Sequence, residues 1–379
     1  MKARGLFVAA LCAASAAFAA PGASAKPPPH LKHVFIIVLE NQNYEASFGK
    51  KPASRYLAKR LTKKGELLKQ YYATAHESNP NYLAMISGQG PNADTQADCQ
   101  SYNDFVPGTP TMGGLYVGQG CVYPNGVETI ANQLEDHGYT WKGYMQDMNA
   151  STPKGDPEVT CRHPAANAPD DTQTAEAHDQ YATRHNPFVY FHQITDFETC
   201  NENNIDLKHL RRDLKKEKTT PNYSFITPDL CNDAHDEPCP NGKPGGMKQA
   251  THFLRRWVPR IRRSAAYRHR GLLMITFDEA EGLPGEGDAS ACCNEQPGPN
   301  TVNAGGPVPG PGGGRIGSVL LSPCIKPGTM NEDPYNHYSM LRSFEDNWDL
   351  PHLGMAGQDG LEPFDSKVLN RRSCRARHG

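Results

Sequence analysis

Four side chains with oxygen atoms that could bind a cation stand in two pairs, and each pair directly follows a run of mainly apolar residues. Glu40 and Asn41 form the first pair, and Asp278 and Glu279 form the second. Three carboxylates and one amide oxygen suit a hard divalent cation. Carboxylates that meet without a cation repel one another and raise each other's pKa. The two pairs therefore predict a metal site, and unrelated acids at distant strand ends are the alternative.

Ser78 is the candidate nucleophile. Asn79 can cap a helix, Pro80 suits the first helical position, and Gly88 suits the end, so the pattern places Ser78 at a helix start. The positive end of a helix favours an anion, and its free N–H groups can hold a phosphate. Coordination to a cation would activate the hydroxyl further. An ordinary helix cap is the alternative for a lone serine.

Two histidines stand in polar turns after expected strands, His235 near residue 227 and His337 before a C-terminal helix. Either imidazole could protonate a leaving group or bind phosphate. A surface or capping role is the alternative for each.

The elements that must position these residues alternate between strand and helix, which predicts an α/β fold with a mainly parallel sheet. Ligands of such sheets bind at the carboxyl ends of the strands, where both pairs of oxygen donors stand. We expect strands at 34–39, 139–145, 222–227, 271–277 and 316–321, and an extended piece at 70–75. We expect helices at 54–69, 79–87, 128–137, 247–267 and 338–348, and a mostly helical end to 190–214.

Three segments rich in glycine, proline and polar residues are expected to be long loops: 90–125, 147–186 and 281–314. The chain contains 35 Gly and 32 Pro, which is below the level typical of disorder but favours long ordered loops.

The first 25 residues have the pattern of a secretory signal peptide, with Lys2 and Arg4 before an apolar stretch and Ala23-Ser24-Ala25 as the cleavage site. The pattern predicts a secreted or periplasmic protein with no transmembrane segment. Residues 26–379 are expected to form a single domain.

Ten of the 11 cysteines remain after residue 25, and an even number in an exported chain predicts up to five disulfides. The pairs close in sequence are Cys231 with Cys239 and Cys99 with Cys121. No C-x-x-C pairs with zinc-site spacing occur, so these thiols are not expected to bind zinc.

The net charge of -2 shows no nucleic-acid footprint. Basic residues cluster at 255–270, but they alternate with apolar residues at helical spacing and predict a solvated helix face.

Five motifs in order resemble those of the phosphoesterase family, which groups secreted acid phosphatases with bacterial phospholipases C. They are E-N-Q-N-Y-E-A-S-F-G, H-E-S-N-P-N-Y-L-A-M-I-S-G, T-P-D-L-C-N-D-A-H-D, T-F-D-E-A-E-G and N-H-Y-S-M-L-R-S-F-E-D. The resemblance implies an alkaline-phosphatase-like three-layer sandwich, with a mainly parallel central sheet flanked by helices and long disulfide-tied loops.

The resemblance also implies roles for single residues. Glu40 and Asn41 match the first metal-binding pair, and Asp278 and Glu279 match the second. Ser78 matches the nucleophile that becomes a phospho-enzyme, and it is also expected to contact the cation.

Other matched positions lie near the phosphate: His235 and His337 as catalytic residues, and Asn81 and Asp236 as substrate-binding residues. One departure from many relatives is that Glu77 and Asn79 flank Ser78. The added carboxylate leaves the preferred substrate open.

The resulting hypothesis is a secreted, metal-dependent acid phosphatase that hydrolyses phosphate monoesters through Ser78. Its cation would be Ca, Mg, Mn, Fe or Zn, and its substrate a small phosphomonoester or a phosphoinositide or phospholipid head group. The alternatives are a phospholipase C or phosphodiesterase with the same site, and a non-catalytic exported protein that binds a phosphorylated ligand.

Overall fold

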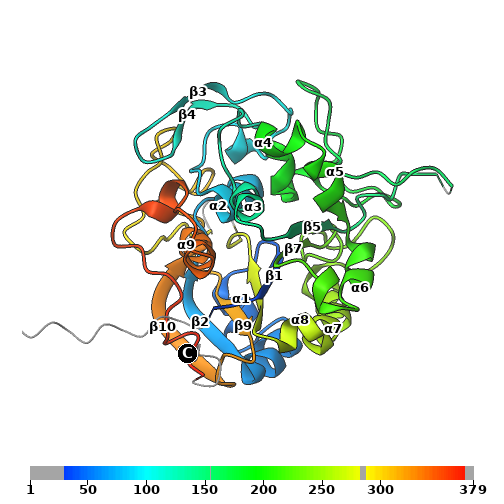
Figure 1. The fold of residues 1–379 in the computed structure, drawn as a ribbon, viewed down its shortest axis with the longest axis vertical. Helices are drawn as coiled ribbons and strands as arrows, with labels where there is room; N and C mark the ends of the chain where they lie inside the picture. Colours follow the sequence, from blue (N-terminus) through cyan, green and yellow to red (C-terminus); the bar gives the residue numbers. More distant parts are fainter. Residues whose placement is uncertain (1–29, 154, 282–286, 372–379) are drawn as a thin grey trace, which may run out of the picture.

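The computed structural model describes residues 30–153, 155–281 and 287–371. The expected signal segment, 1–25, lies outside these residues. Within the described ranges, one eight-stranded sheet has the order β10-β2-β9-β8-β1-β7-β5-β6, and β3 and β4 form a separate hairpin (Figure 1).

The sheet strands are β1 His33–Leu39, β2 Glu66–Tyr72, β5 Trp141–Met145, β6 Asn204–Asp206, β7 Tyr223–Thr227, β8 Gly271–Phe277, β9 Ser318–Leu321 and β10 Thr329–Asn336. The hairpin strands are β3 Val106–Pro110 and β4 Tyr116–Gln119. The α-helices are α1 Tyr44–Phe48, α2 Ser78–Ser87, α3 Ile130–Asp136, α4 His192–Thr195, α5 Thr199–Asn203, α6 Leu210–Asp213, α7 Gly246–Arg263, α8 Ala265–Arg268 and α9 His337–Asn347.

The central strand β1 pairs in parallel with β7 on one side and β8 on the other. Among the described strands of this sheet, β9 alone runs antiparallel to its neighbours. The carboxyl ends of β1, β7 and β8 therefore lie side by side at one edge of the sheet. We call the opposite end, where the parallel strands begin, the base.

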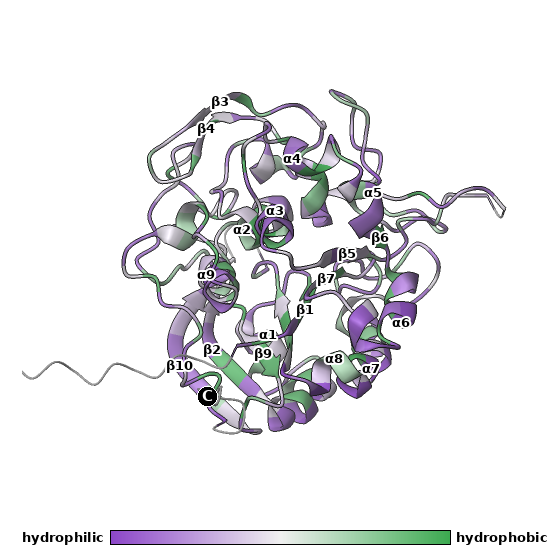
Figure 2. Ribbon diagram, viewed as in Figure 1, coloured by the Kyte–Doolittle hydropathy of each residue, from purple (hydrophilic) through white to green (hydrophobic). Residues whose placement is uncertain are grey.

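Every residue of β1, β7, β8 and β9 is buried. Successive side chains of a strand point to opposite faces, so both faces of the sheet are covered. Helix α2 packs against α3 and α9. Helix α7 packs against α8 and the turn at Tyr56–Leu61, and α8 packs against β8. Figure 2 shows apolar strands inside and hydrophilic turns on the outer helices. The expected three-layer α/β architecture is confirmed.

The expected helix at 54–69 is wrong over its second half. A π-helical turn at Tyr56–Leu61 and a 3-10 turn at Thr62–Lys64 end at Gly65, and the chain then enters β2. In β2, Leu67 pairs with Met330 of β10 and Val319 of β9. Pairing on both sides thus overrides the helical spacing of the leucines.

Other differences are smaller. Helix α2 begins at Ser78, with Glu77 rather than Asn79 at the cap position. The expected helix at 247–267 divides at Ser264, which caps α8 through its side chain. Strands β6 and β10 were not expected. Strand β6 is only three residues long, and β10 consists mostly of polar residues and contains Pro334, so neither has an apolar run.

Four disulfides join cysteines within the described ranges: Cys99–Cys121, Cys161–Cys200, Cys231–Cys239 and Cys292–Cys293. Both pairs expected from sequence proximity are among them. Cys324 is also disulfide-bonded. Three of these bonds, Cys99–Cys121, Cys161–Cys200 and Cys231–Cys239, hold the long segments between sheet strands, whereas Cys292–Cys293 joins adjacent residues.

None of the helices in the described part of the chain combines the length and the apolar character that crossing a membrane requires.

Candidate active site

The carboxyl ends of β1 and β8 bring together the two pairs of residues predicted to bind a cation through oxygen atoms. The backbone N–H groups of Asn41 and Glu279 both donate to Asp278 Oδ1, at 3.1 and 2.7 Å. Asp278 Oδ2 and Asn41 Oδ1 are buried and have no hydrogen-bond partner among the described residues. Two oxygen acceptors are thus left open, which is the chemistry that a bound cation would satisfy.

Ser78 reaches the same place from the start of α2. Its Oγ donates to Glu40 Oε2 at 2.9 Å, and the hydroxyl of Tyr82, one turn later, donates to Glu40 Oε1. The cap residue Glu77 has φ +62°, an uncommon conformation for a residue with a side chain, which turns the chain sharply into the helix. Ser78, Tyr82 and Glu40 are all buried.

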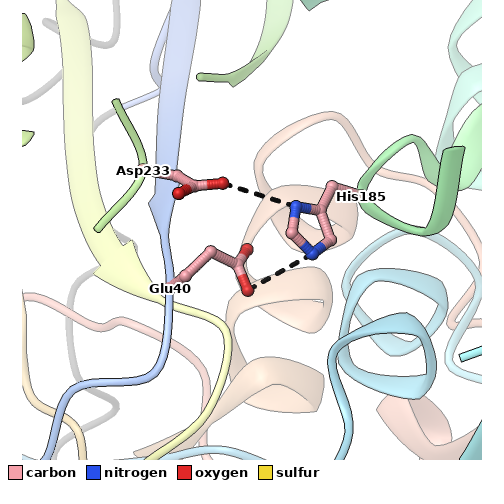
Figure 3. A group of neighbouring side chains, drawn as sticks. All are labelled: Glu40, His185 and Asp233. Carbon is pink, nitrogen blue, oxygen red and sulfur yellow. Dashed lines mark ion pairs between the residues drawn. The ribbon is translucent and has the colours of Figure 1, made fainter. Parts of the chain in front are cut away.

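A third set of residues comes from the loop after β5 and the turn after β7, as Figure 3 shows. His185 Nε2 lies 3.4 Å from Glu40 Oε2, and His185 Nδ1 lies 3.5 Å from Asp233 Oδ2. Neither contact has hydrogen-bond geometry, so both ring nitrogens and Asp233 Oδ2 lack a partner in the described structure. Glu40, His185 and Asp233 together could hold a metal ion.

The position of His185 is fixed by packing and backbone contacts. It ends a 3-10 turn at Thr183–His185, and its ring stacks on Tyr82 with centroids 5.2 Å apart. Asp233 is tied to the sheet because its carbonyl accepts from the backbone N–H of Glu40 at 2.9 Å. Sequence reasoning missed both residues. His185 lies in a segment expected to be only a surface loop, and no spacing in the sequence relates it to Glu40.

Burial governs the electrostatics of these groups. Burial, together with Asp278 and Asp233, raises the pKa of Glu40 well above its usual value. The pKa of Asp233 and that of Asp278 are also raised, chiefly by burial. Burial lowers the pKa of His185 well below its usual value, so the imidazole is neutral and its nitrogens can act as ligands.

Glu279 was expected to bind the cation, but its carboxylate contacts a histidine instead. Its carboxylate bonds His76 Nδ1, and His76 Nε2 donates to the carbonyl of Asp288 at 3.1 Å. Burial, then Asp278 and Glu77, raise the pKa of Glu279. Glu279 thus lies beside the open oxygens of Asp278 and Asn41, but its own carboxylate is already engaged.

His337 begins α9 and is fully buried. Its Nε2 donates to the carbonyl of Asp278 at 2.6 Å, and its Nδ1 accepts from the Tyr71 hydroxyl at 3.2 Å. Burial lowers its pKa to about 4. With both nitrogens engaged, His337 supports the backbone of Asp278 and has no free proton to offer a substrate.

His235 and Asp236 are neighbours in the turn that follows β7. His235 is exposed, and its Nδ1 contacts Asp236 Oδ1 at 2.8 Å. Its Nε2 lies 3.4 Å from Arg184 Nη2. Asp236 therefore orients the imidazole of His235, while a carboxylate would repel a phosphate.

Asn81 holds the backbone instead of facing the site. Its Oδ1 accepts from the N–H groups of Thr74 and Ala75, both at 3.0 Å. Its two amide hydrogens go to the carbonyls of Ala75 and Glu77. No amide hydrogen is left for a phosphate oxygen, so Asn81 supports the backbone around the start of α2 instead of binding substrate.

A pocket of about 440 Å³ opens beside the ends of β1 and β8 and the start of α2, and its described lining includes Glu77 but not Ser78. Its lining includes Asn41, His76, Glu77, His235 and Glu279. Of the described residues around it, Ala234 supplies the one apolar side chain. The pocket suits a small polar molecule rather than acyl chains.

Comparison with known proteins gives matches along most of the chain. The model of the phosphoesterase family matches residues 56–351, a span that includes Ser78, Asp278 and His337 and begins after Asn41. The phosphate-repressible acid phosphatase of Penicillium chrysogenum is 26% identical over 321 residues, which are 84% of this chain and 59% of that protein. The chain therefore spans about three-fifths of the length of this fungal relative.

Two further similarities are informative. The phosphatidylinositol-3-phosphatase of Mycobacterium tuberculosis is 25% identical over 335 residues, which are 88% of this chain and 83% of that protein. A crystal structure of a protein in the alkaline phosphatase superfamily from Vibrio parahaemolyticus matches with a TM-score of 0.50 and 13% identity. The match covers 90% of this chain and 73% of that chain, and it supports the likeness of fold.

Proposed function

The chain belongs to the phosphoesterase family, and from that premise we propose that it is an exported, metal-dependent phosphomonoesterase with Ser78 as the nucleophile. The observation that carries this proposal is the hydrogen bond from Ser78 Oγ to Glu40 Oε2, next to the unpartnered oxygens of Asn41 and Asp278. A cap serine alone would not need a buried carboxylate as acceptor.

The residues present fit a divalent cation. Asn41 and Asp278 offer open oxygens on one side of Glu40, and His185 and Asp233 offer open atoms on the other. A cation bound there would polarise the phosphoryl group and lower the pKa of the Ser78 hydroxyl. Glu279 remains a predicted ligand, and binding would require it to exchange His76 for the cation.

The chain's own groups can then perform both halves of the reaction. Ser78 Oγ forms a bond to phosphorus, its proton passes to Glu40 Oε2, and the bond from phosphorus to the leaving oxygen breaks. The leaving oxygen takes a proton from His235, which lines the pocket, and for this step the imidazole exchanges its Nε2 contact with Arg184 for the substrate. Water then attacks phosphorus and returns a proton to His235, and Ser78 recovers its proton as phosphate leaves.

The polar pocket favours small monoesters over phospholipid diesters, because acyl chains would find Ala234 as their one apolar contact among the described lining residues. Export is supported by the disulfides, which form in oxidising compartments. The signal segment itself lies outside the described residues.

The test is Ser78→Ala, assayed with p-nitrophenyl phosphate, phosphatidylcholine and phosphoinositides side by side. We expect turnover of the monoester to fall by at least a thousandfold, with an unchanged circular dichroism spectrum. Thr199→Ala, which removes an exposed hydroxyl bonded to Glu135, is the matched control. Retained turnover in Ser78→Ala would remove Ser78 from the mechanism. Phosphate binding without turnover in the wild type would favour the non-catalytic alternative.

A further inference from the structure

Basic side chains from separate parts of the chain gather at the base of the sheet. Lys63 and Lys64 precede β2, and the end of α7 precedes β8. Pro323 follows the antiparallel strand β9, and Arg371 donates to its carbonyl at 3.2 Å. In Figure 1, α7 and α8 lie at the lower end of the molecule.

These side chains line two hollows on either side of the last turns of α7. The first hollow, of about 260 Å³, is lined by Leu214, Ser264 and four cationic side chains. The cationic side chains are those of Arg211, Lys215, Arg260 and Arg263. The second hollow, of about 370 Å³, has four more: Lys63, Lys64, Arg262 and Arg371. Figure 2 shows the hydrophilic character of α6 and α7.

No carboxylate from the described residues lines either hollow, and none of the eight cations forms an ion pair there. Carboxylates on neighbouring segments are paired elsewhere: Asp213 with Lys142 and Arg212, Glu217 with His33 and His269, and Asp333 with Lys367. Burial and then Arg256, Arg211 and Arg263 lower the pKa of Arg260, as expected where positive charge is not compensated.

The opposite end of the molecule has acidic side chains instead of basic ones. The candidate active-site pocket is lined by Glu77, Glu237, Glu279 and Glu281. Because the net charge of the chain is -2, the cations at the base are a local concentration and not a general property of the surface.

An exposed apolar side chain lies at the same end. Met330 is the second residue of β10, which starts beside the start of β2, and it is 68% exposed. Free cations on both sides of one helix, together with an exposed methionine, suit a broad surface of phosphate groups over apolar chains.

We propose that the base of the molecule docks on an anionic phospholipid surface, with lipid phosphates in the two hollows and Met330 in the interface. The active-site pocket lies at the other end of the sheet, so a docked molecule presents it to the surrounding solution. Docking in this orientation would concentrate the protein at a surface and leave the pocket open to the solution. This proposal does not depend on the proposed function.

The first test is co-sedimentation with phosphatidylcholine vesicles that contain or lack 30% phosphatidylglycerol. Each surface cation strengthens binding to an anionic bilayer by roughly fivefold at low salt. We therefore expect Arg211→Gln/Lys215→Gln/Arg263→Gln to weaken binding by about a hundredfold. The control, Lys50→Gln/Lys51→Gln/Lys243→Gln, removes the same charge from exposed lysines outside both hollows and should bind like the wild type.

The second test separates a lipid surface from a soluble polyanion. Met330→Ser should weaken binding to the anionic vesicles and leave any binding to soluble polyphosphate unchanged. Lysine acylation read by mass spectrometry should show vesicles protecting Lys63, Lys64 and Lys215 but not Lys50 or Lys243. Equal binding to neutral vesicles, an equal loss in the control triple, or tighter binding to polyphosphate than to vesicles would overturn the proposal.

Discussion

Glu40 connects most of the candidate site. One of its oxygens accepts from Ser78 and lies 3.4 Å from His185, and the other accepts from Tyr82. Because the carboxylate is fully buried, each of these neighbours affects how easily it carries charge. Substitutions around Glu40 should therefore have larger effects than their distance from the substrate suggests.

Tyr82→Phe should destabilise the protein by about 2 kcal/mol, because it removes a donor from a buried carboxylate. Urea denaturation would measure the change. Tyr223→Phe is the matched control, since the buried Tyr223 hydroxyl has no hydrogen-bond partner in the described residues. We expect the control to be neutral or slightly stabilising. An equal loss in both variants would contradict the role given to the Tyr82 hydroxyl.

His185→Asn should weaken cation binding by at least tenfold, because it removes a neutral nitrogen ligand from beside Glu40 and Asp233. Isothermal titration with Mn²⁺ would measure the affinity directly. His192→Asn removes a partly exposed histidine that pairs with Asp104 and Asp196, and it should leave the affinity unchanged. If His185→Asn binds Mn²⁺ as the wild type does, the cation is held without this side.

Among the elements, those with a strong local pattern were predictable. The apolar runs of β1 and β8, and Pro80 in the first turn and Gly88 at the end of α2, specify these elements through a few adjacent residues. β2 was not predictable, because its partners β9 and β10 lie more than 240 residues later and decide its conformation. His185 is a similar case, since only tertiary packing brings its loop to Glu40.

β2 also begins with a buried acid, and its titration gives a test of stability. Burial and then Asp365 raise the pKa of Glu66 to about 8, against a usual value of 4.5. The folded protein therefore keeps this proton over a pH range in which the unfolded chain has lost it. Folding must take up a proton there, so Glu66 costs stability that grows as the pH rises from 4.5 toward 8.

Glu66→Gln should raise the melting temperature at pH 7 to 8, with a gain of roughly 2 kcal/mol, and should have no effect near pH 4. Thermal melts at the two pH values would measure the difference. Glu332→Gln, at an exposed carboxylate of β10, is the control and should change little at either pH. A gain that does not depend on pH would show that the Glu66 carboxyl is not the cause.

At the scale of the whole molecule, the buried acids should couple cation binding to stability. Glu40, Asp233 and Asp278 come from different strand ends, and without a cation they must either repel one another or take up protons, as their raised pKa values indicate. Removing the cation should therefore loosen contacts between strands, in addition to abolishing activity.

Chelation should lower the melting temperature by a few degrees, and added Mn²⁺ or Ca²⁺ should restore it. A ligand at a hundred times its Kd stabilises the folded state by about 2.7 kcal/mol. Differential scanning calorimetry with and without EDTA would measure the shift. The shift should disappear in Asp278→Asn/Asp233→Asn, and its persistence there would place the cation elsewhere in the molecule.

The hydrogen bond between His337 and the carbonyl of Asp278 makes the candidate site depend on a residue that is synthesised late. Ser78 and Glu40 emerge early from the ribosome, but Asp278 is 237 residues beyond Asn41. His337, which donates to the Asp278 carbonyl, follows 59 residues later. A nascent chain or proteolytic fragment that ends before His337 contains Ser78, Glu40 and Asp278 but lacks the hydrogen bond that supports the Asp278 backbone. We therefore expect activity only from molecules that have finished synthesis and closed the sheet edge.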